Sequence, residues 1–210
     1  LIRDGDYIFS AQATAEPIEI MSNLGHLKET GVRGCVLVTC LPLRDYDYFH
    51  DQDMKGILDH HAWFMSPGLR KAYEEKLVSP VPQRSTTILK KILKRIEKEN
   101  RRPVVICTVS PMDRHGYFSL SVSNVYEMDL IEAGALTLVE VNPNFPRTFG
   151  DNQVHVSRVD AIVEANHPIP TVKLAPYGEI DSKIGAYIAD YIEDGSTVQL
   201  GIGNIPNAVA

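Results

Sequence analysis

A strand, two closely spaced glycines and a helix start are predicted near the end of the chain. An Asp-Gly turn at 194–195 precedes residues 196–200, which alternate small or polar with apolar side chains as a short strand does. Gly201 and Gly203 then leave the backbone uncovered, and Pro206 fixes φ where a helix begins. Free N–H groups beside a helix N-terminus suit an anion or a developing oxyanion. The pattern therefore predicts an anion-binding loop.

Known glycine-rich motifs of nucleotide binding and of nucleophilic catalysis do not match this loop. A dinucleotide fingerprint requires a third glycine where Pro206 stands, and an acidic residue about 20 positions later. The Gly-Lys-Ser/Thr of a P-loop and the Gly-x-Ser-x-Gly of a nucleophile elbow are also missing from it. On spacing alone, the two glycines indicate either a ligand site or a purely structural turn.

Two other clusters contain residue types that do chemistry. Asp113 and His115 lie in a turn-rich loop after a buried strand, where they predict either an acid/base pair or a turn shaped by Asp, Pro and Gly. The run 59–61 reads Asp-His-His and permits a metal site, but no third ligand follows at a recognisable spacing. Surface polar residues or hydrogen-bonded loop histidines are the alternative, and we predict no metal.

Charge is distributed unevenly along the chain. The net charge is −6, yet residues 70–102 hold 11 of the 21 basic residues and only four acids. Because the chain as a whole is acidic, nucleic-acid binding is disfavoured. Within the basic segment, residues 86–100 predict an amphipathic helix whose lysine-rich face is either solvated or a docking face for a membrane surface or phosphates.

Hydrophobic residues make up 44% of the chain, but no apolar run reaches the roughly 18 residues that span a bilayer.

The three cysteines predict a reducing compartment. Cys35 and Cys40 lie five residues apart in one strand-like run, so their side chains point to opposite faces and cannot form a disulfide. Together with Cys107 they are predicted to be buried, reduced thiols, which favours the cytoplasm.

Apolar strands alternate with amphipathic helices along most of the chain, which predicts an α/β fold with a mostly parallel sheet. The predicted strands are 6–10, 34–41, 103–109, 135–141, 156–163 and 196–200, and the predicted helices are 17–30, 66–76, 86–100, 124–133 and 181–192. In the last helix, Ile184, Tyr187, Ile188, Tyr191 and Ile192 are predicted to face inward.

Five ordered stretches resemble the acetyl-CoA hydrolase/transferase family, especially its 4-hydroxybutyrate and butyrate:acetate CoA-transferases. They are Ala-Glu-Pro at 15–17, Ser-Pro-Met-Asp-Arg-His-Gly at 110–116, Glu-Val-Asn at 140–142 with Pro146, Gly150 and Asp151, His-Val-Ser at 155–157 with Asp160, and the glycine loop at 197–209; Phe-Met-Ser-Pro at 64–67 with Arg70 also fits. The resemblance implies a three-layer α/β/α, class I CoA-transferase-like N-terminal domain over residues 1–210, a fragment that lacks its C-terminal catalytic domain.

The implied reaction is ping-pong transfer of CoA between an acyl-CoA and a small carboxylic acid, through a glutamyl-CoA thioester. Hydrolysis of acyl-CoA by the same family is one alternative, and a non-catalytic ligand-sensing domain is another. The resemblance also implies a homo-oligomer and contact with the protein's own C-terminal domain. Neither nucleic acid nor a membrane is predicted as a partner, because the chain is acidic and has no long apolar run.

The resemblance assigns CoA binding to residues of the glycine loop, which match the family loop one by one: Gly201, Ile202, Gly203, Asn204 and Ile205. The family's nucleophile is a glutamate in a His-Ser/Thr-Glu segment shortly after that loop, and is expected beyond Ala210. None of Glu16, Glu140 or Glu164 matches it. Residues 81–102 are longer and more basic than is usual in the family, so the basic helix lies outside the resemblance.

Overall fold

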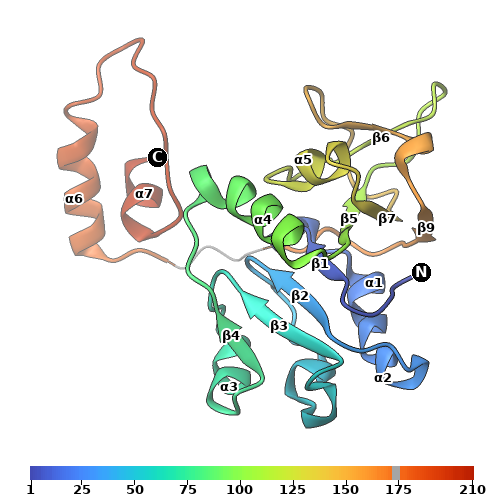
Figure 1. Ribbon diagram of the computed structural model, residues 1–210. Coiled ribbons are helices and arrows are strands. Elements are labelled where there is room, and N and C mark those ends of the chain that lie inside the picture. Colours follow the sequence, from blue (N-terminus) through green and yellow to red (C-terminus); the bar gives the residue numbers. More distant parts are fainter. Residues whose placement is uncertain (172–175) are drawn as a thin grey trace. The chain divides into compact units, whose positions relative to one another are not determined.

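The computed structural model describes residues 1–171 and 176–210. The chain divides into two compact units, Leu1–Pro170 and Thr171–Ala210 (Figure 1), and each is described by itself.

A seven-stranded parallel sheet forms the centre of the first unit. Its order is β4-β3-β2-β1-β5-β7-β9, and every neighbouring pair is parallel. The strands are β1 (Tyr7–Ser10), β2 (Cys35–Thr39), β3 (Leu58–Ala62), β4 (Val78–Pro80), β5 (Pro103–Val109), β7 (Leu136–Val141) and β9 (Ala161–Glu164). All residues of β1 and β2 are buried, because helices cover both faces of a parallel sheet. The predicted α/β fold with a mostly parallel sheet is confirmed.

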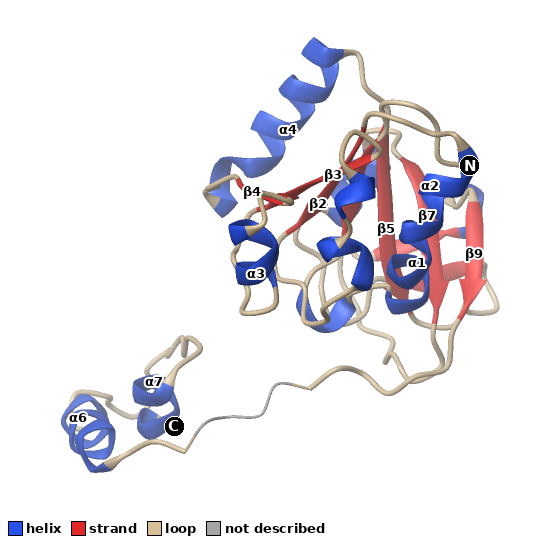
Figure 2. Cartoon of the chain, turned by 90° about the horizontal axis from the view of Figure 1, so that it is seen from below, coloured by secondary structure: helices blue, strands red, loops and turns tan. Residues whose placement is uncertain are grey.

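Helices form a layer on each face of this sheet (Figure 2). One layer contains α1 (Ile18–Asn23), α2 (Leu27–Thr30) and α3 (Leu69–Glu74), and the other contains α4 (Ser85–Glu99) and α5 (Glu127–Glu132). Met21 and Leu69 belong to the first apolar core, while Ile92 and Leu130 belong to the second. Because all seven strands are parallel, their carboxyl ends lie at the same edge of the sheet, between the two helical layers.

Several element boundaries differ from the sequence predictions. The single helix predicted for 17–30 is divided by a 3-10 turn at Leu24–His26, where a side chain on Gly25 would come within 3.3 Å of Tyr48 Cβ. β9 begins at Ala161 rather than at 156, because Val156–Arg158 forms a 3-10 turn. The strands β3 and β4 were not predicted, because polar residues in β3 and prolines around β4 conceal the apolar pattern.

A small antiparallel pair, β6 (Tyr117–Ser119) with β8 (Gln153–His155), was also missed. Three-residue strands are too short for a two-residue alternation to be recognised in a sequence.

The second unit consists of α6 (Glu179–Ala189), α7 (Asn204–Val209) and the segment between them. A Cβ on Gly185 would lie 2.6 Å from Ala208 O, so glycine is required where α6 contacts α7.

The predicted strand at 196–200 is wrong: the described residues of this unit offer no strand to pair with it, and a lone strand leaves its backbone groups unsatisfied. The predicted inward stripe is wrong at four of its five positions, since Tyr187 and Tyr191 are 70% and 87% exposed and Ile188 and Ile192 are 41% and 38% exposed. The fifth, Ile184, is half-buried.

No helix among residues 1–171 and 176–210 has the length and apolar character needed to cross a membrane.

Candidate functional site

The predicted CoA loop lies in the second unit, where it leads directly into α7. Gly203 is the residue before the helix and has φ +151°, a conformation that side chains rarely adopt, so glycine is required there for backbone reasons. Gly201 has open space around it, with no atom within 4 Å of where a Cβ would be. Ile202 is 97% exposed, and Asn204 and Ile205 are exposed at the start of α7. The loop therefore presents an accessible backbone, as an anion-binding loop requires.

A groove of about 490 Å³ adjoins this loop within the second unit. Apolar side chains from the end of α6, from the segment between the two helices and from α7 dominate its walls, and Gly201 also lines it. The apolar members are Ile188, Tyr191, Ile192, Val198, Leu200, Ile205, Pro206 and Val209. An apolar groove beside an exposed backbone loop has the composition of a site for a ligand with both apolar and anionic parts.

Within the first unit, Glu140 ties together three segments at the carboxyl edge of the sheet. It is the penultimate residue of β7 and is fully buried, and its Oε2 accepts hydrogen bonds from the backbone N–H groups of Glu19 (2.7 Å) and Ile20 (3.2 Å) at the start of α1. Its Oε1 lies 2.7 Å from His167 Nε2. Pro17, before α1, offers no side-chain cap, so this distant carboxylate satisfies the helix's first donors.

Glu16 is a second buried carboxyl at the same edge. Its Oε2 accepts a hydrogen bond from Leu43 N (3.1 Å), while its Oε1 and the hydroxyl of Tyr46 have no hydrogen-bond partner among the described residues. Burial raises the pKa of Glu16 to about 7. Burial, followed by the charge of Glu16, raises the pKa of Tyr46. The carboxyl of Glu16 is thus partly protonated near neutral pH.

The Glu16→Gln variant is expected to lose a pH dependence of stability. Because the folded chain holds the Glu16 proton more tightly than the unfolded chain, the stability contributed by this group is present below pH 4.5 and is lost as pH rises to about 7. Urea titrations of wild type should show a loss of about 1.4 kcal/mol per pH unit in that window, which the variant lacks. Glu19→Gln, at an exposed position of the neighbouring helix α1, is the control. Equal slopes for wild type and Glu16→Gln would contradict a raised pKa.

Glu127 is a third fully buried carboxylate near this edge, and burial raises its pKa. Its Oε2 accepts hydrogen bonds from Val125 N (2.6 Å) and Tyr126 N (3.0 Å), while Tyr126 OH bonds to Ser10 O at the end of β1. Sequence reasoning missed the roles of the three glutamates. For Glu140, the signal that the sequence offered was a glutamate near the end of an otherwise apolar strand.

Asp113 shapes the turn in which it lies. Its Oδ1 accepts hydrogen bonds from His115 N (2.8 Å) and Tyr117 N (2.9 Å), and its Oδ2 lies 2.9 Å from Arg147. The hydrogen bond from Tyr117 is the main cause that lowers the pKa of Asp113. The contact with His115 is therefore through the backbone, which supports the turn-shaping alternative over an acid/base pair.

Asp59, His60 and His61 do not converge on a metal ion. They lie in β3, where successive side chains point to opposite faces of the sheet. His60 Nε2 lies 2.8 Å from Thr39 Oγ1, and burial lowers the pKa of His60 to about 3; His61 Nδ1 lies 3.3 Å from Tyr7 OH. Residues 1–171 and 176–210 contain no group of three His, Cys, Asp or Glu side chains placed to hold a metal.

All three cysteines are free thiols. Cys35 and Cys107 are buried as predicted, whereas Cys40 is only partly buried because β2 ends at Thr39, one residue before it. Burial raises the pKa of each thiol.

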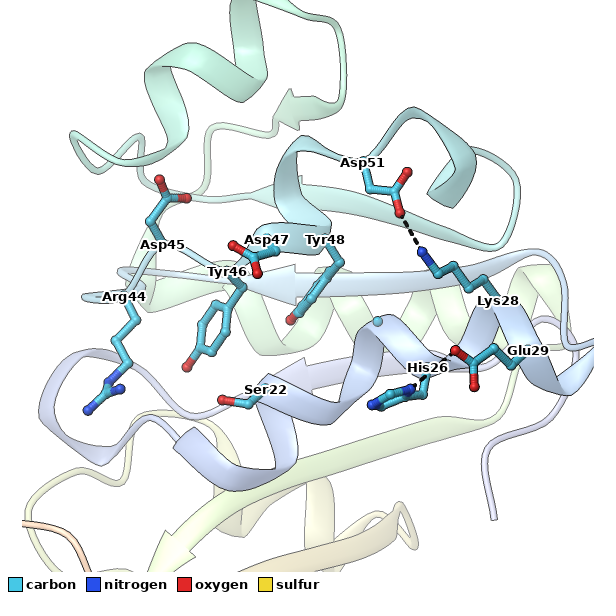
Figure 3. Close-up of a pocket in the computed structure, with 11 residues that line it drawn as sticks. Ser22, His26, Lys28, Glu29, Arg44, Asp45, Tyr46, Asp47, Tyr48 and Asp51 are labelled. Atoms are coloured by element: carbon cyan, nitrogen blue, oxygen red, sulfur yellow. Dashed lines mark hydrogen bonds and ion pairs between the residues drawn. The ribbon is translucent and has the colours of Figure 1, made fainter.

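A groove of about 500 Å³ lies between the α1–α2 region and residues 44–51 in the first unit (Figure 3). Four carboxylates line it, against the two cations Lys28 and Arg44; the carboxylates are Glu29, Asp45, Asp47 and Asp51. Lys28 Nζ is already paired with Asp51 at 3.0 Å. This excess of negative charge makes the groove unfavourable for phosphate groups.

Comparison with known proteins places these features in a family. Residues 1–173 match the model of the acetyl-CoA hydrolase/transferase N-terminal domain. The chain is 34% identical over 210 residues to a 4-hydroxybutyrate coenzyme A transferase of Clostridium kluyveri, covering 99% of this chain and 47% of the relative. It is 36% identical over 165 residues to a succinyl-CoA:cyclohexane-1-carboxylate CoA transferase of Geobacter metallireducens, covering 78% and 36%. The chain thus spans less than half the length of these relatives.

Solved structures share the fold. RipA from Yersinia pestis superposes with a TM-score of 0.86 at 26% identity, covering 99% of this chain and 50% of that one. A 4-hydroxybutyrate CoA-transferase from Porphyromonas gingivalis superposes with a TM-score of 0.68 at 26% identity, covering 98% and 46%. The match of residues 1–173, the relatives and the shared fold agree with the resemblance found in the sequence, and the chain belongs to the acetyl-CoA hydrolase/transferase family.

Proposed function

We propose that this chain is the CoA-binding part of an acyl-CoA:carboxylate CoA-transferase. The observation that carries the proposal is the family match over residues 1–173, together with relatives whose names describe CoA transferases. The glycine loop supports it, since its backbone is open at Gly201 and Ile202. Gly201, Ile202, Gly203, Asn204 and Ile205 are the proposed CoA-binding residues.

The proposed chemistry is nucleophilic catalysis by a glutamate that lies outside these 210 residues. Its ionised carboxylate attacks the thioester carbonyl, CoA thiolate leaves, and a mixed anhydride forms. The thiolate then attacks the glutamyl carbonyl, which releases the first carboxylic acid and leaves a glutamyl-CoA thioester for the incoming acid. The loop's N–H groups are proposed to stabilise developing negative charge.

The glutamates described here support a nucleophile elsewhere. Glu140 is fully buried with both oxygens engaged, and Glu16 is 1% exposed. Glu164 is exposed on the edge strand β9, without the hydrogen bonds that would orient it among the described residues. None presents a free, oriented carboxylate to a substrate.

The protein's C-terminal part, an acyl-CoA and a small carboxylic acid are its proposed partners, in a cytoplasmic homo-oligomer. The free thiols support a reducing compartment.

Hydrolysis of acyl-CoA is the second candidate, because the matching family model covers hydrolases as well as transferases. The full-length protein should be incubated with butyryl-CoA, with and without acetate. Transfer predicts acetyl-CoA formation that depends on acetate, with little free thiol released. Thiol release without acetate would favour the hydrolase, and CoA binding without turnover would favour a sensor.

A further inference from the structure

A small hollow lies between α4 and the sheet, within the first unit. Ile88, Ile92 and Ile96 pack the helix against the strands and are each 6–7% exposed. Figure 1 shows α4 crossing the strands of this unit. Beside the packed isoleucines a space of about 70 Å³ remains, which we name the α4 hollow. All of the residues that line it belong to the first unit.

Cations surround one side of the α4 hollow. Lys91 and Arg95 line it, and Lys91 has no ion-pair partner among the described side chains. Arg95 donates from Nε to Glu99 at 2.8 Å, while its two terminal nitrogens have no hydrogen bond to the described part of the chain. Arg101 pairs with the same Glu99 at 3.1 Å, and the guanidinium carbon atoms of both arginines lie within 6 Å of the Tyr7 ring centre. Three cations thus stand beside one carboxylate, which favours an anion there.

Gln83 also lines the α4 hollow, and its amide is not satisfied within the chain. The side-chain oxygen Oε1 is buried and has no hydrogen-bond partner among the described residues. A buried polar atom without a partner destabilises the folded state. Turning the amide by half a rotation exchanges its oxygen with an NH₂ group, which donates to an anion in the hollow. Gln83 therefore provides a further donor beside Lys91 and Arg95.

The remaining wall of the α4 hollow is apolar. Trp63, Val81 and Ile92 form it, and the Trp63 ring is held in place by Tyr126, whose ring centre is 5.3 Å away. A ligand that fits both walls has an anionic end and a short apolar end. Because one water requires about 10–15 Å³ of such space, a hollow of about 70 Å³ accommodates about four or five heavy atoms, the size of acetate or propionate.

We propose that the α4 hollow binds a short-chain monocarboxylate such as acetate or propionate. The free terminal nitrogens of Arg95 form a planar fork that matches the two oxygens of a carboxylate, and Lys91 adds a second charge. The methyl or ethyl group lies against Trp63. This binding site is additional to the proposed function and does not rest on it, because neither CoA nor the glycine loop takes part.

The test uses the fluorescence of Trp63, the only tryptophan in the 210 residues. Full-length protein is titrated with acetate, propionate, hexanoate, acetamide or chloride at one pH and one ionic strength, and Trp63→Phe identifies the part of the signal that comes from this residue. A ligand with so few heavy atoms binds weakly, so we expect a Kd of about 1–10 mM for acetate and propionate. Hexanoate is too long for the hollow, and acetamide and chloride lack the carboxylate.

Three variants locate the site. Lys91→Gln should raise the Kd for acetate about threefold, as the loss of an exposed charge does, and Arg95→Gln about tenfold or more. Lys94→Gln is the matched control, because it makes the same change at an exposed position of α4 outside the hollow and should leave the Kd unchanged. Arg95→Gln also loses the ion pair with Glu99, so circular dichroism must show that each variant is folded; the Lys91→Gln comparison stands without it.

Saturable binding of acetate that weakens in Lys91→Gln and Arg95→Gln but not in Lys94→Gln would support the inference. An acetate response that does not saturate in wild type, or one with the same Kd in Lys91→Gln as in wild type, would overturn it. An equal response to acetamide, chloride or hexanoate would overturn the assignment to short carboxylates. Each of these outcomes leaves the proposed function in place, since CoA transfer is not the quantity measured.

Discussion

Replacing Glu140 with alanine is expected to lower the free energy of unfolding by about 3–5 kcal/mol. The substitution leaves the Glu19 and Ile20 N–H groups at the start of α1 without their acceptor, and removes the partner of His167 Nε2. Pro17 cannot replace the lost cap, and the site is fully buried, so water does not compensate easily. Urea or thermal unfolding of the variant measures the loss directly.

Glu164→Ala is the matched control for this experiment. Glu164 ends the neighbouring strand β9, next to Val141 in the sheet register, but its side chain is exposed. Its replacement should change stability by less than about 0.5 kcal/mol. A similarly small change for Glu140→Ala would show that this carboxylate does not hold the edge together.

The centre of the fold was predictable because its strands are buried on both faces. The apolar run 103–109 coincides with β5, and the runs around β1, β2 and β7 were located to within about two residues. Burial on both faces produces continuous apolar sequence, which is the strongest signal a parallel strand leaves. β3 was lost because His60 and His61 interrupt this signal, one facing each core layer.

The second unit was predicted less well for a different reason. A strand at 196–200 and an inward stripe on α6 both require a surface to pack against, and residues 176–210 do not supply one. A sequence pattern indicates which side chains would be buried in a helix or strand, whereas their actual burial depends on which other elements pack against them. The uncovered backbone predicted at Gly201 and Gly203 is present, whereas the positive φ of Gly203 emerged only from the structure.

The site was only partly accessible from sequence. Type and spacing identified the loop, and resemblance assigned it to CoA. The hydrogen bonds of Glu16 and Glu140 join segments 27 to 121 residues apart, and no local pattern reveals such pairings.

Gly201→Val is the second change for which we expect a large effect, in this case on CoA binding. The free protein should tolerate a side chain at this position, because no atom lies within 4 Å of the added Cβ. A bound CoA, however, must approach the backbone at the same place, so the valine should cost about 2–3 kcal/mol of binding free energy, or roughly a thirtyfold to hundredfold rise in Kd. Gly203 is less informative, because its φ of +151° strains any side chain even without ligand.

Gly178→Ala provides the control in the same unit. Gly178 has φ −91°, and its added Cβ would meet only Asp181 Oδ2 at 4.0 Å, so neither fold nor binding should change.

The most direct test of CoA binding by the glycine loop is calorimetric titration of CoA into the full-length wild type, Gly201→Val and Gly178→Ala, after circular dichroism has shown that all three are equally folded. We predict wild-type affinity for Gly178→Ala and a Kd raised by at least about thirtyfold for Gly201→Val. Equal affinity in all three proteins would contradict the assignment of the loop to CoA.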